Sequence, residues 1–452
     1  MVVYGTPGAV VLYDFISTSY TAPARALHGE QSDLYMVQSN NFLAMQPGVG
    51  GFGIVNAGQI TTTSGFCSIT ASPTNAVVVD GTGGWVFTDG SFAFAAISPW
   101  QATGANTVTY VAGFFVAEQP KTQKFWVSNF NDPTTWNALA FAQLASDSGN
   151  IVAVDNLLGN LILFAEQGTE SWQNVGGSPE PFAPILSASN EFGLAAIASR
   201  QHLDQTLVYL AQTRTGKVQV VQLIGLSPKV ISDTDLENII NGFNKVDIFT
   251  NISAGISDAV ALTYQIDTHK FYQITFPSAL PLPRSFLWNA STGIWTEVQS
   301  GTQGGRHIGN LSTYWRSVSI ISDYQKNILY TMSDTAYTDN GLPIVREVIT
   351  RHTLSNFNRF RVDSLYLDMD TGVGTQTGQG VNPQVMLQYS KDNGRTWSAE
   401  RWSSLGQVGQ YLNRVLWRRF GSTRDATFRI RMTDPVKFVI TEGALKLSER
   451  AQ

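Results

Sequence analysis

Short apolar runs separated by turn residues recur along most of this chain, and this pattern restricts its fold more than any other feature. Each run has about the length of one β-strand, is rich in Val, Ile, Phe and Trp, and lacks the period of an amphipathic helix. Residues 125–172 hold several such runs, with turn residues at Asn131-Asp132-Pro133 and at Gly149-Asn150. We expect this stretch to form one antiparallel sheet of about four strands, the unit of a β-propeller blade.

The same strand–turn–strand pattern lies on both sides of this stretch. Its spacing is irregular, on the order of 35 to 55 residues, which brackets the periods of propellers. The sequence therefore predicts an all-β fold that begins with a β-propeller of six or seven blades. The other copies of the pattern lie at residues 34–45, 76–87, 207–220, 259–274 and 317–330.

The charge of the chain divides it in two. Residues 1–344 carry 13 Lys and Arg against 24 Asp and Glu, whereas residues 345–452 carry 16 against 10. In the second part the apolar residues alternate with polar ones: Leu365, Leu367 and Met369 share one face of a strand. Such a period of two is typical of an antiparallel β-sandwich. We predict a β-propeller domain at 1–343 and a β-sandwich-like platform domain at 344–452.

Composition excludes several classes of protein. A single cysteine, Cys67, excludes an internal disulfide framework and a zinc site built from cysteines. No segment is long and apolar enough to span a bilayer, and the N-terminus lacks the basic-then-apolar pattern of a signal peptide. The sequence therefore predicts a protein made in a reducing cytosol. Charged residues are only 14% of the chain, below the usual value of about 25%, which suits burial of its surface against other subunits.

Two local patterns have ordinary structural interpretations. Residues 48–53 match the dinucleotide-binding pattern G-x-G-x-x-G, but no helical period follows them, so we expect a flexible loop. Residues 232–243 predict a short amphipathic helix, with Thr234 and Glu237 forming a capping box and Gly242 ending the helix.

The sharpest local motif lies in the second domain. It resembles the Asp-box of sialidases and other propellers, which is an element of fold and is not itself catalytic. Its residues predict a hairpin turn in which the Asp caps the backbone, the Gly takes a positive φ and the Trp packs beneath. These residues are Ser390, Asp392, Gly394, Thr396 and Trp397.

Arginines concentrate in the same domain and form our candidate interface. Basic residues on one strand face could bind phosphate, but acidic residues lie nearby and arginine is enriched at protein interfaces, so we favour contacts with subunits or an adaptor. The candidate residues are Arg414, Arg418, Arg419, Arg424, Arg429 and Arg431. We find no catalytic constellation: the five histidines are far apart in the sequence, and there is no Walker A string or G-x-S-x-G elbow. The sequence predicts no catalytic residues, no metal site, no cofactor and no enzyme activity.

Many of these stretches together resemble a known family, the packaged-DNA stabilisation proteins, or tail hub (nozzle) proteins, of short-tailed bacteriophages. The resemblance covers nearly the whole chain and is most specific in the second half. In that family a further N-terminal segment commonly precedes the Tyr-Gly-Thr-Pro-Gly stretch, which lies here at residues 4–8, so we expect that segment to be short or absent. The stretches that carry the resemblance are 125–136, 168–172, 305–310, 323–324 and 337–343, then 367–374, 380–397, 402–406, 414–418 and 434–436.

The resemblance implies a virion structural protein, located in the tail and present in the host cytoplasm during assembly. It implies a ring of six copies below the portal and its head-to-tail adaptor, with a tail needle, fibres or tailspikes as further partners. The ring would close the tail channel over packaged DNA and later conduct that DNA without binding a specific sequence. We add the hypothesis that the acidic part borders the channel, so that DNA slides without adhering.

Two other functions remain open from the sequence alone. A glycan-binding or sialidase-like propeller would need a glycan pocket and could act as a monomer. A host scaffold propeller would bind peptide partners and form no ring.

Overall fold

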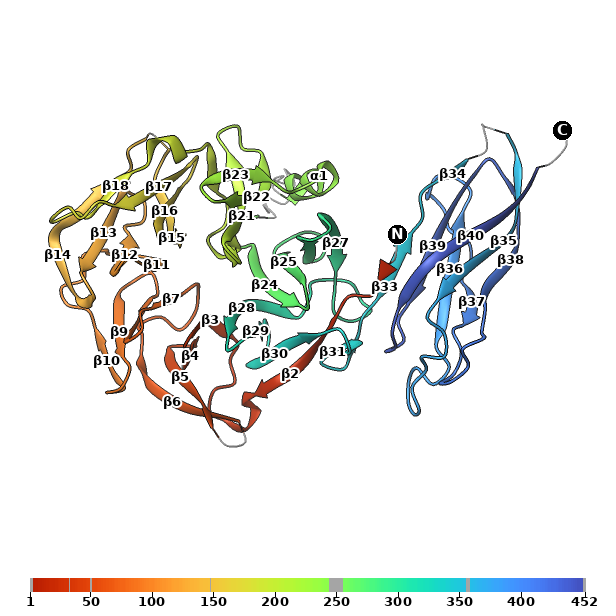
Figure 1. Ribbon diagram of the computed structural model, residues 1–452, viewed down its shortest axis with the longest axis horizontal. Helices are drawn as coiled ribbons and strands as arrows, with labels where there is room; N and C mark the ends of the chain where they lie inside the picture. Colours follow the sequence, from red (N-terminus) through yellow and green to blue (C-terminus); the bar gives the residue numbers. More distant parts are fainter. Residues whose placement is uncertain are drawn as a thin grey trace. The chain divides into compact units, whose positions relative to one another are not determined.

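The chain forms two compact units in the computed structural model (Figure 1). The structure describes residues 3–31, 33–48, 51–146, 148–243, 255–354 and 358–449. One unit comprises Val11–Val298 and Gly305–Thr331, and the other comprises Met1–Val10, Gln299–Gly304 and Met332–Gln452. The division at residue 343 therefore stays a prediction, since the compact units assign parts of 1–343 to both sides.

The first unit is a β-propeller with seven blades among the described residues (Figure 1). In each blade the first strand lies nearest the centre, and at six of the seven junctions between blades it contacts the first strand of the neighbouring blade. The first four blades are β3 (Ala24–Glu30), β4 (Asp33–Gln38), β5 (Asn41–Gly48) and β6 (Gly51–Gln59); β7 (Ser68–Ala71), β8 (Asn75–Val79), β9 (Gly84–Thr88) and β10 (Ala93–Ala96); β11 (Val108–Val111), β12 (Phe114–Glu118), β13 (Lys124–Asn129) and β14 (Asp132–Gln143); and β15 (Ile151–Leu157), β16 (Asn160–Ala165), β17 (Thr169–Asn174) and β18 (Phe182–Pro184).

The remaining blades include one with a divided inner strand and one closed by the start of the chain. The fifth consists of β19 (Phe192–Leu194) and β20 (Gln201–Leu203), which both pair with β21 (Thr206–Thr213), then β22 (Val218–Ile224) and β23 (Ser227–Val230). The sixth consists of β24 (Val260–Ile266), β25 (His269–Phe276), β26 (Arg284–Asn289) and β27 (Ile294–Val298). The seventh consists of β28 (Gly309–Trp315), β29 (Val318–Asp323) and β30 (Ile328–Ser333), with β2 (Gly8–Asp14) as its outer strand. Because the first and last strands of the propeller share this sheet, the ring of blades is closed by hydrogen bonds.

The propeller core lies between blades. Middle strands are covered on both faces, so they read as continuous apolar runs; in β16, residues 161–165 are all fully buried. Outer strands have one open face and a mixed composition, as the alternating burial of β14 shows.

This difference overturns the prediction that residues 125–172 form one sheet. β13 and β14 complete the third blade, whereas β15 to β18 form the fourth. The third blade ends with β14, so the break between the two sheets comes after residue 143. The polar and small residues of β14 lack the apolar run by which strands were recognised in the sequence. The predicted turn around Asn131 is present, as a hairpin between β13 and β14 of the third blade.

The predicted helix exists as α1 (Thr234–Phe243), but the predicted capping box is wrong. Asp233 is the residue that caps it, because its Oδ1 accepts the Leu236 N–H at 2.8 Å. Glu237 turns instead to Ser232, Gln219 and Lys217. Leu236, Ile240 and Phe243 are buried in one cluster with residues of the fifth and sixth blades, most of which come from the second and third strands of those blades. Gly242 lies inside the helix and does not end it.

The glycine-rich pattern at 48–53 is part of a hairpin. β5 extends to Gly48 and β6 begins at Gly51, so most of the predicted loop is strand; residues 49–50 lie outside the described residues. No described helix is long and apolar enough to cross a membrane.

The second unit is a β-sandwich of two antiparallel sheets, as the alternating pattern predicted. The strands of one sheet are β1 (Val3–Tyr4), β40 (Val439–Glu449), β35 (Phe360–Met369) and β38 (Val415–Thr423). The strands of the other are β33 (Arg346–Ile349), β39 (Asp425–Met432), β36 (Gln384–Ser390) and β37 (Arg401–Ser404), with β34 (Thr353–Leu354) also paired to β39. Leu365, Leu367 and Met369 face Phe428, Ile430 and Met432 in one shared core. A short hairpin of β31 (Thr338–Asp339) and β32 (Leu342–Pro343) precedes them.

Candidate functional site

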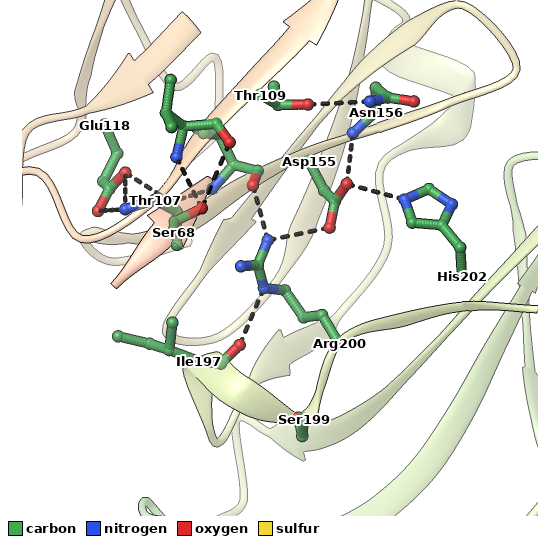
Figure 2. A network of polar contacts seen from close by, with 12 residues as sticks. Ser68, Thr107, Thr109, Glu118, Asp155, Asn156, Ile197, Ser199, Arg200 and His202 are labelled. Atoms are coloured by element: carbon green, nitrogen blue, oxygen red, sulfur yellow. Dashed lines mark hydrogen bonds and ion pairs between the residues drawn. The ribbon is translucent and has the colours of Figure 1, made fainter. Parts of the chain in front are cut away.

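A network of polar side chains joins the inner strands of four neighbouring blades (Figure 2). Asp155 on β15 receives two groups from the fifth blade: Arg200 Nη1 lies 3.0 Å from Oδ2, and His202 Nε2 lies 3.0 Å from Oδ1. Arg200 also donates to the Val154 carbonyl at 2.6 Å. Burial acts to raise the pKa of Asp155, but His202 and Arg200 outweigh it, and the pKa lies below its ordinary value.

The pKa of the histidine in this network shifts in the opposite direction. Burial acts to lower the pKa of His202, but the Asp155 carboxylate raises it above its ordinary value. An Asp–His pair can act as a general base when a hydroxyl nucleophile lies beside it. Figure 2 draws one serine of the same blade, Ser199, apart from His202, and its hydroxyl donates to the Ala196 carbonyl at 2.7 Å and accepts the Leu210 N–H at 3.0 Å. Both of its hydrogen-bonding roles are therefore used within its own blade, which supports a structural network.

A buried carboxylate lies at the other end of the network (Figure 2). Glu118 Oε1 accepts the N–H groups of Asn106 and Thr107 at 2.7 and 3.0 Å, and Oε2 accepts the Thr107 hydroxyl at 2.6 Å. That hydroxyl in turn accepts the Val154 N–H of the next blade at 2.9 Å. Burial raises the pKa of Glu118 to about 7. The carboxylate therefore holds the segment that leads into β11 and, through Thr107, the fourth blade.

Equivalent bonds continue around the propeller. The Gln201 amide donates to the Ala261 carbonyl at 2.9 Å, joining the fifth and sixth blades. The Thr263 N–H donates to Ser312 Oγ at 2.8 Å, and the Gly29 N–H donates to Thr313 Oγ1 at 2.8 Å. Side-chain bonds at the inner strands thus tie the second to the seventh blade in series, and the seventh blade to the first, in addition to apolar packing. This arrangement stabilises the propeller ring.

The predicted hairpin turn in the sandwich has a dense set of hydrogen bonds. Asp392 Oδ1 accepts the Ser390 hydroxyl at 2.7 Å and the Thr396 N–H at 2.9 Å, and Oδ2 accepts the Thr396 hydroxyl at 2.6 Å. These bonds lower the pKa of Asp392 to about 2. Gly394 has a φ of +81°, and the residue before it, Asn393, is also left-handed. The polar groups of Ser390, Asp392 and Thr396 therefore bond within the turn itself.

Two of the candidate arginines, Arg429 and Arg431, have partners within the sandwich. The Arg429 guanidinium lies 4.0 Å from the centre of the Trp397 ring, a cation–π contact. Arg431 bonds Glu347 on the neighbouring strand β33 at 2.7 Å. Because both side chains have partners within the sandwich, they are less available to a partner than the sequence suggested.

The other four candidate arginines are exposed and lie elsewhere. Arg414 precedes β38, Arg418 and Arg419 lie on it, and Arg424 lies in the turn to β39. The six residues are therefore divided between two sheets and do not form one basic strand face. Whether they contact other subunits stays a prediction.

Sequence reasoning missed the main residues of the inner network. The sequence patterns assign no role to Asp155 and do not connect it with Arg200 or His202. Two signals were present: Arg200 is among the first four basic residues of the chain, and a buried strand that carries an Asp needs a partner for it. The spacing of 45 residues between Asp155 and Arg200 gives no local pattern, because only the packing of adjacent blades brings them together.

The chain was compared with known protein families, curated proteins and solved structures. Residues 16–337 match the family model described as bacteriophage P22 Gp10, beta-propeller, and residues 345–448 match the model described as bacteriophage P22 Gp10, beta-sandwich. No curated protein matches.

Solved structures resemble the chain only distantly. The WD40 domain of Neurospora crassa Pan2 is 8% identical, with a TM-score of 0.43, over 73% of this chain and 95% of that one. The extracellular domain of the hybrid two component system BT4673 from B. thetaiotaomicron is 7% identical, with a TM-score of 0.46, over 89% of this chain and 48% of that one.

Proposed function

We propose that this chain, which belongs to the bacteriophage P22 Gp10 family, forms the tail hub or nozzle ring of its virion. Membership makes it a phage structural protein of a kind that stabilises packaged DNA. The observation that carries the proposal is that both family models match in chain order, on a propeller and on a sandwich of the expected type.

The proposed ring contains six copies and lies below the portal and its head-to-tail adaptor. It closes the tail channel to retain DNA and conducts the DNA outward during ejection. A tail needle, fibres or tailspikes attach to it, and the chain passes through the host cytoplasm during assembly. These partners are those of a virion tail, which is where the family is found.

A structural role fits the polar chemistry of the described residues. The Asp155–Arg200–His202 network and the Asp392 turn use their donors and acceptors within the fold. We therefore propose no enzyme activity. Family membership favours the virion role over the glycan-binding or sialidase-like alternative.

The proposal is tested by the mass of the purified full chain, alone and with the portal–adaptor assembly, followed by electron microscopy. We expect a closed ring that docks on the adaptor end. A monomer that ignores the portal and binds glycans would overturn the proposal.

The acidic character of the propeller supports a further part of the proposal. Its unit carries 13 Lys and Arg against 22 Asp and Glu, and DNA phosphates would be repelled by such a surface. We propose that acidic surface borders the channel. Tight binding of duplex DNA by the isolated ring at physiological salt would contradict this.

A further inference from the structure

The two faces of the propeller differ in their turns. In a blade of four antiparallel strands, the turn after the first strand and the turn after the third lie on one face, and the remaining turn lies on the other. We call the former the turn face. It carries a large, exposed apolar side chain in six of the seven blades. These residues are Phe92 (40% exposed), Phe130 (63%), Leu158 (54%), Ile224 (48%), Ile294 (43%) and Tyr314 (64%).

Two of these residues conflict with the chemistry of their own turns. Leu158 and Gly159 form a two-residue hairpin loop with φ values of +51° and +79°, and Phe92 also has a φ of +51°. Asn, Asp or Gly is favoured in such positions, and the same face has Asn131, Asp204 and Asp267 with similar φ values. A leucine that is both exposed and left-handed adds nothing to the fold of its hairpin, which points to a role in contact with a partner.

The charge of the turn face indicates the chemistry of that partner. Its turns carry Asp132, Glu180 and Asp267 against one arginine, Arg316, while Asp204 is ion-paired with Lys270 on the same face. A complementary surface would be basic and would present apolar side chains.

The sandwich of the same chain carries such a surface. β37, β38 and the loop between them lie along one edge, joined by the bond from Trp417 Nε1 to the Arg401 carbonyl at 3.0 Å. Residues 401–424 contain five arginines and no Asp or Glu. Trp402 (60% exposed), Tyr411 (72%) and Leu412 (96%) lie in the same segment. We call this surface the arginine edge.

We infer that the turn face of one copy binds the arginine edge of a second copy. This inference rests on the proposed ring and names the two surfaces that build it. Because the surfaces are different, the contact is head-to-tail, and repetition of a head-to-tail contact closes into a ring when the rotation permits. Aromatic and arginine side chains are the usual anchors of such interfaces.

Mixing two full-length variants tests the inference. The first variant, Leu158→Asn with Tyr314→Ser, disables the turn face, and the second, Leu412→Ser with Arg414→Glu, disables the arginine edge. We expect each alone to need at least a tenfold higher concentration to assemble, as measured by mass photometry. An equimolar mixture should give mixed dimers that grow no further, because only one productive contact remains. Leu282→Asn, on the opposite face, and Lys446→Glu, on β40, are the matched controls and should assemble as the wild type does.

The Leu158→Asn change also separates binding from folding. Its thermal midpoint should equal or exceed that of the wild type, since Asn suits a left-handed turn position. Rings that form normally from both variants would overturn this inference and leave the ring itself intact. A wild type that stays monomeric, alone and with the portal–adaptor assembly, would overturn both.

Cross-linking gives an independent check on the assembled ring. The one native cysteine, Cys67, is 2% exposed and burial raises its pKa to about 12, so it should not react. A chain with both Leu158→Cys and Leu412→Cys, treated with a flexible bis-maleimide, should give a ladder of covalent oligomers. Moving the second cysteine to Lys446→Cys should abolish the ladder, and an unchanged ladder would contradict the inference.

Discussion

The two units differ in the charged side chains that they bury. Among the described residues, the propeller unit buries six carboxylates and no lysine or arginine, whereas the sandwich unit buries one carboxylate, Asp339, and one arginine, Arg346. The six in the propeller are Asp33, Asp80, Glu118, Glu170, Glu237 and Asp323. The difference follows from how each unit satisfies its backbone.

A propeller needs a linker from the outer strand of each blade to the inner strand of the next, and linker N–H groups have no ladder partner. Carboxylates supply the acceptors: Asp80 binds the Thr62 N–H at 2.8 Å, and Glu170 binds the N–H groups of Ala145 and Ser146 at 3.0 and 2.8 Å. The sandwich has long strands, such as β40 with 11 residues, whose N–H groups pair with neighbouring strands. Its buried Arg346 serves carbonyl groups instead, at Asp434 and Tyr337. In these cases the buried charge serves backbone groups that lie outside the strand ladders.

The strongest test of this comparison is Glu118→Ala. It would leave the Asn106 and Thr107 N–H groups and the Thr107 hydroxyl without their acceptor in a buried place. We expect the free energy of unfolding to fall by about 4 kcal/mol, since each unsatisfied buried donor costs about 1–3 kcal/mol. Urea unfolding, followed by tryptophan fluorescence, measures it. Glu166→Ala is the control, because that side chain is exposed and makes one long bond to Asn150; similar losses in both variants would refute the argument.

The pH dependence of the propeller sharpens the same point. The pKa of Glu118 is raised from 4.5 to about 7, so its contribution to stability is full below pH 4.5 and is lost as pH rises through 7. The Glu118→Gln variant cannot titrate at this position. We expect the stability of the wild type, relative to this variant, to decrease between pH 4.5 and 7. Thermal midpoints of both proteins across that range would show it, and parallel curves would contradict it.

Arg346→Ala is the counterpart in the sandwich unit. Two carbonyl groups lose their donor, and the guanidinium contact with the Tyr337 ring, at 5.8 Å, is lost. The removal of a buried charge offsets part of this loss, so we expect about 2 kcal/mol of destabilisation, less than for Glu118→Ala. Hydrogen exchange of the sandwich strands is the measurement. A larger loss of stability for Arg346→Ala than for Glu118→Ala would contradict the expected order of the two effects.

Local patterns predicted much of the fold. The alternation at Leu365–Leu367–Met369 placed a strand face correctly, and apolar runs such as 161–165 located buried middle strands. Outer strand β14 was missed because a strand with one open face lacks a continuous apolar run. The inner network was also missed, since Asp155 meets Arg200 only after neighbouring blades pack. The residue pattern of one strand predicts which of its side chains are buried. It does not predict which residues of another blade lie beside them.

The smallest effect is expected at Asp392, an exposed carboxylate of the sandwich unit that is not among the buried charges compared above. Its bonds to Ser390 and Thr396 lie within one turn and join no separate segments. Asp392→Asn should therefore speed amide exchange at Gly394 and Thr396 while leaving the global unfolding midpoint nearly unchanged at pH 7. Since the pKa of Asp392 is about 2, its contribution should be present above pH 4 and fade as pH falls through 2. If this exposed substitution lowered global stability as much as Glu118→Ala does, burial would not explain why the propeller carboxylates contribute strongly to stability.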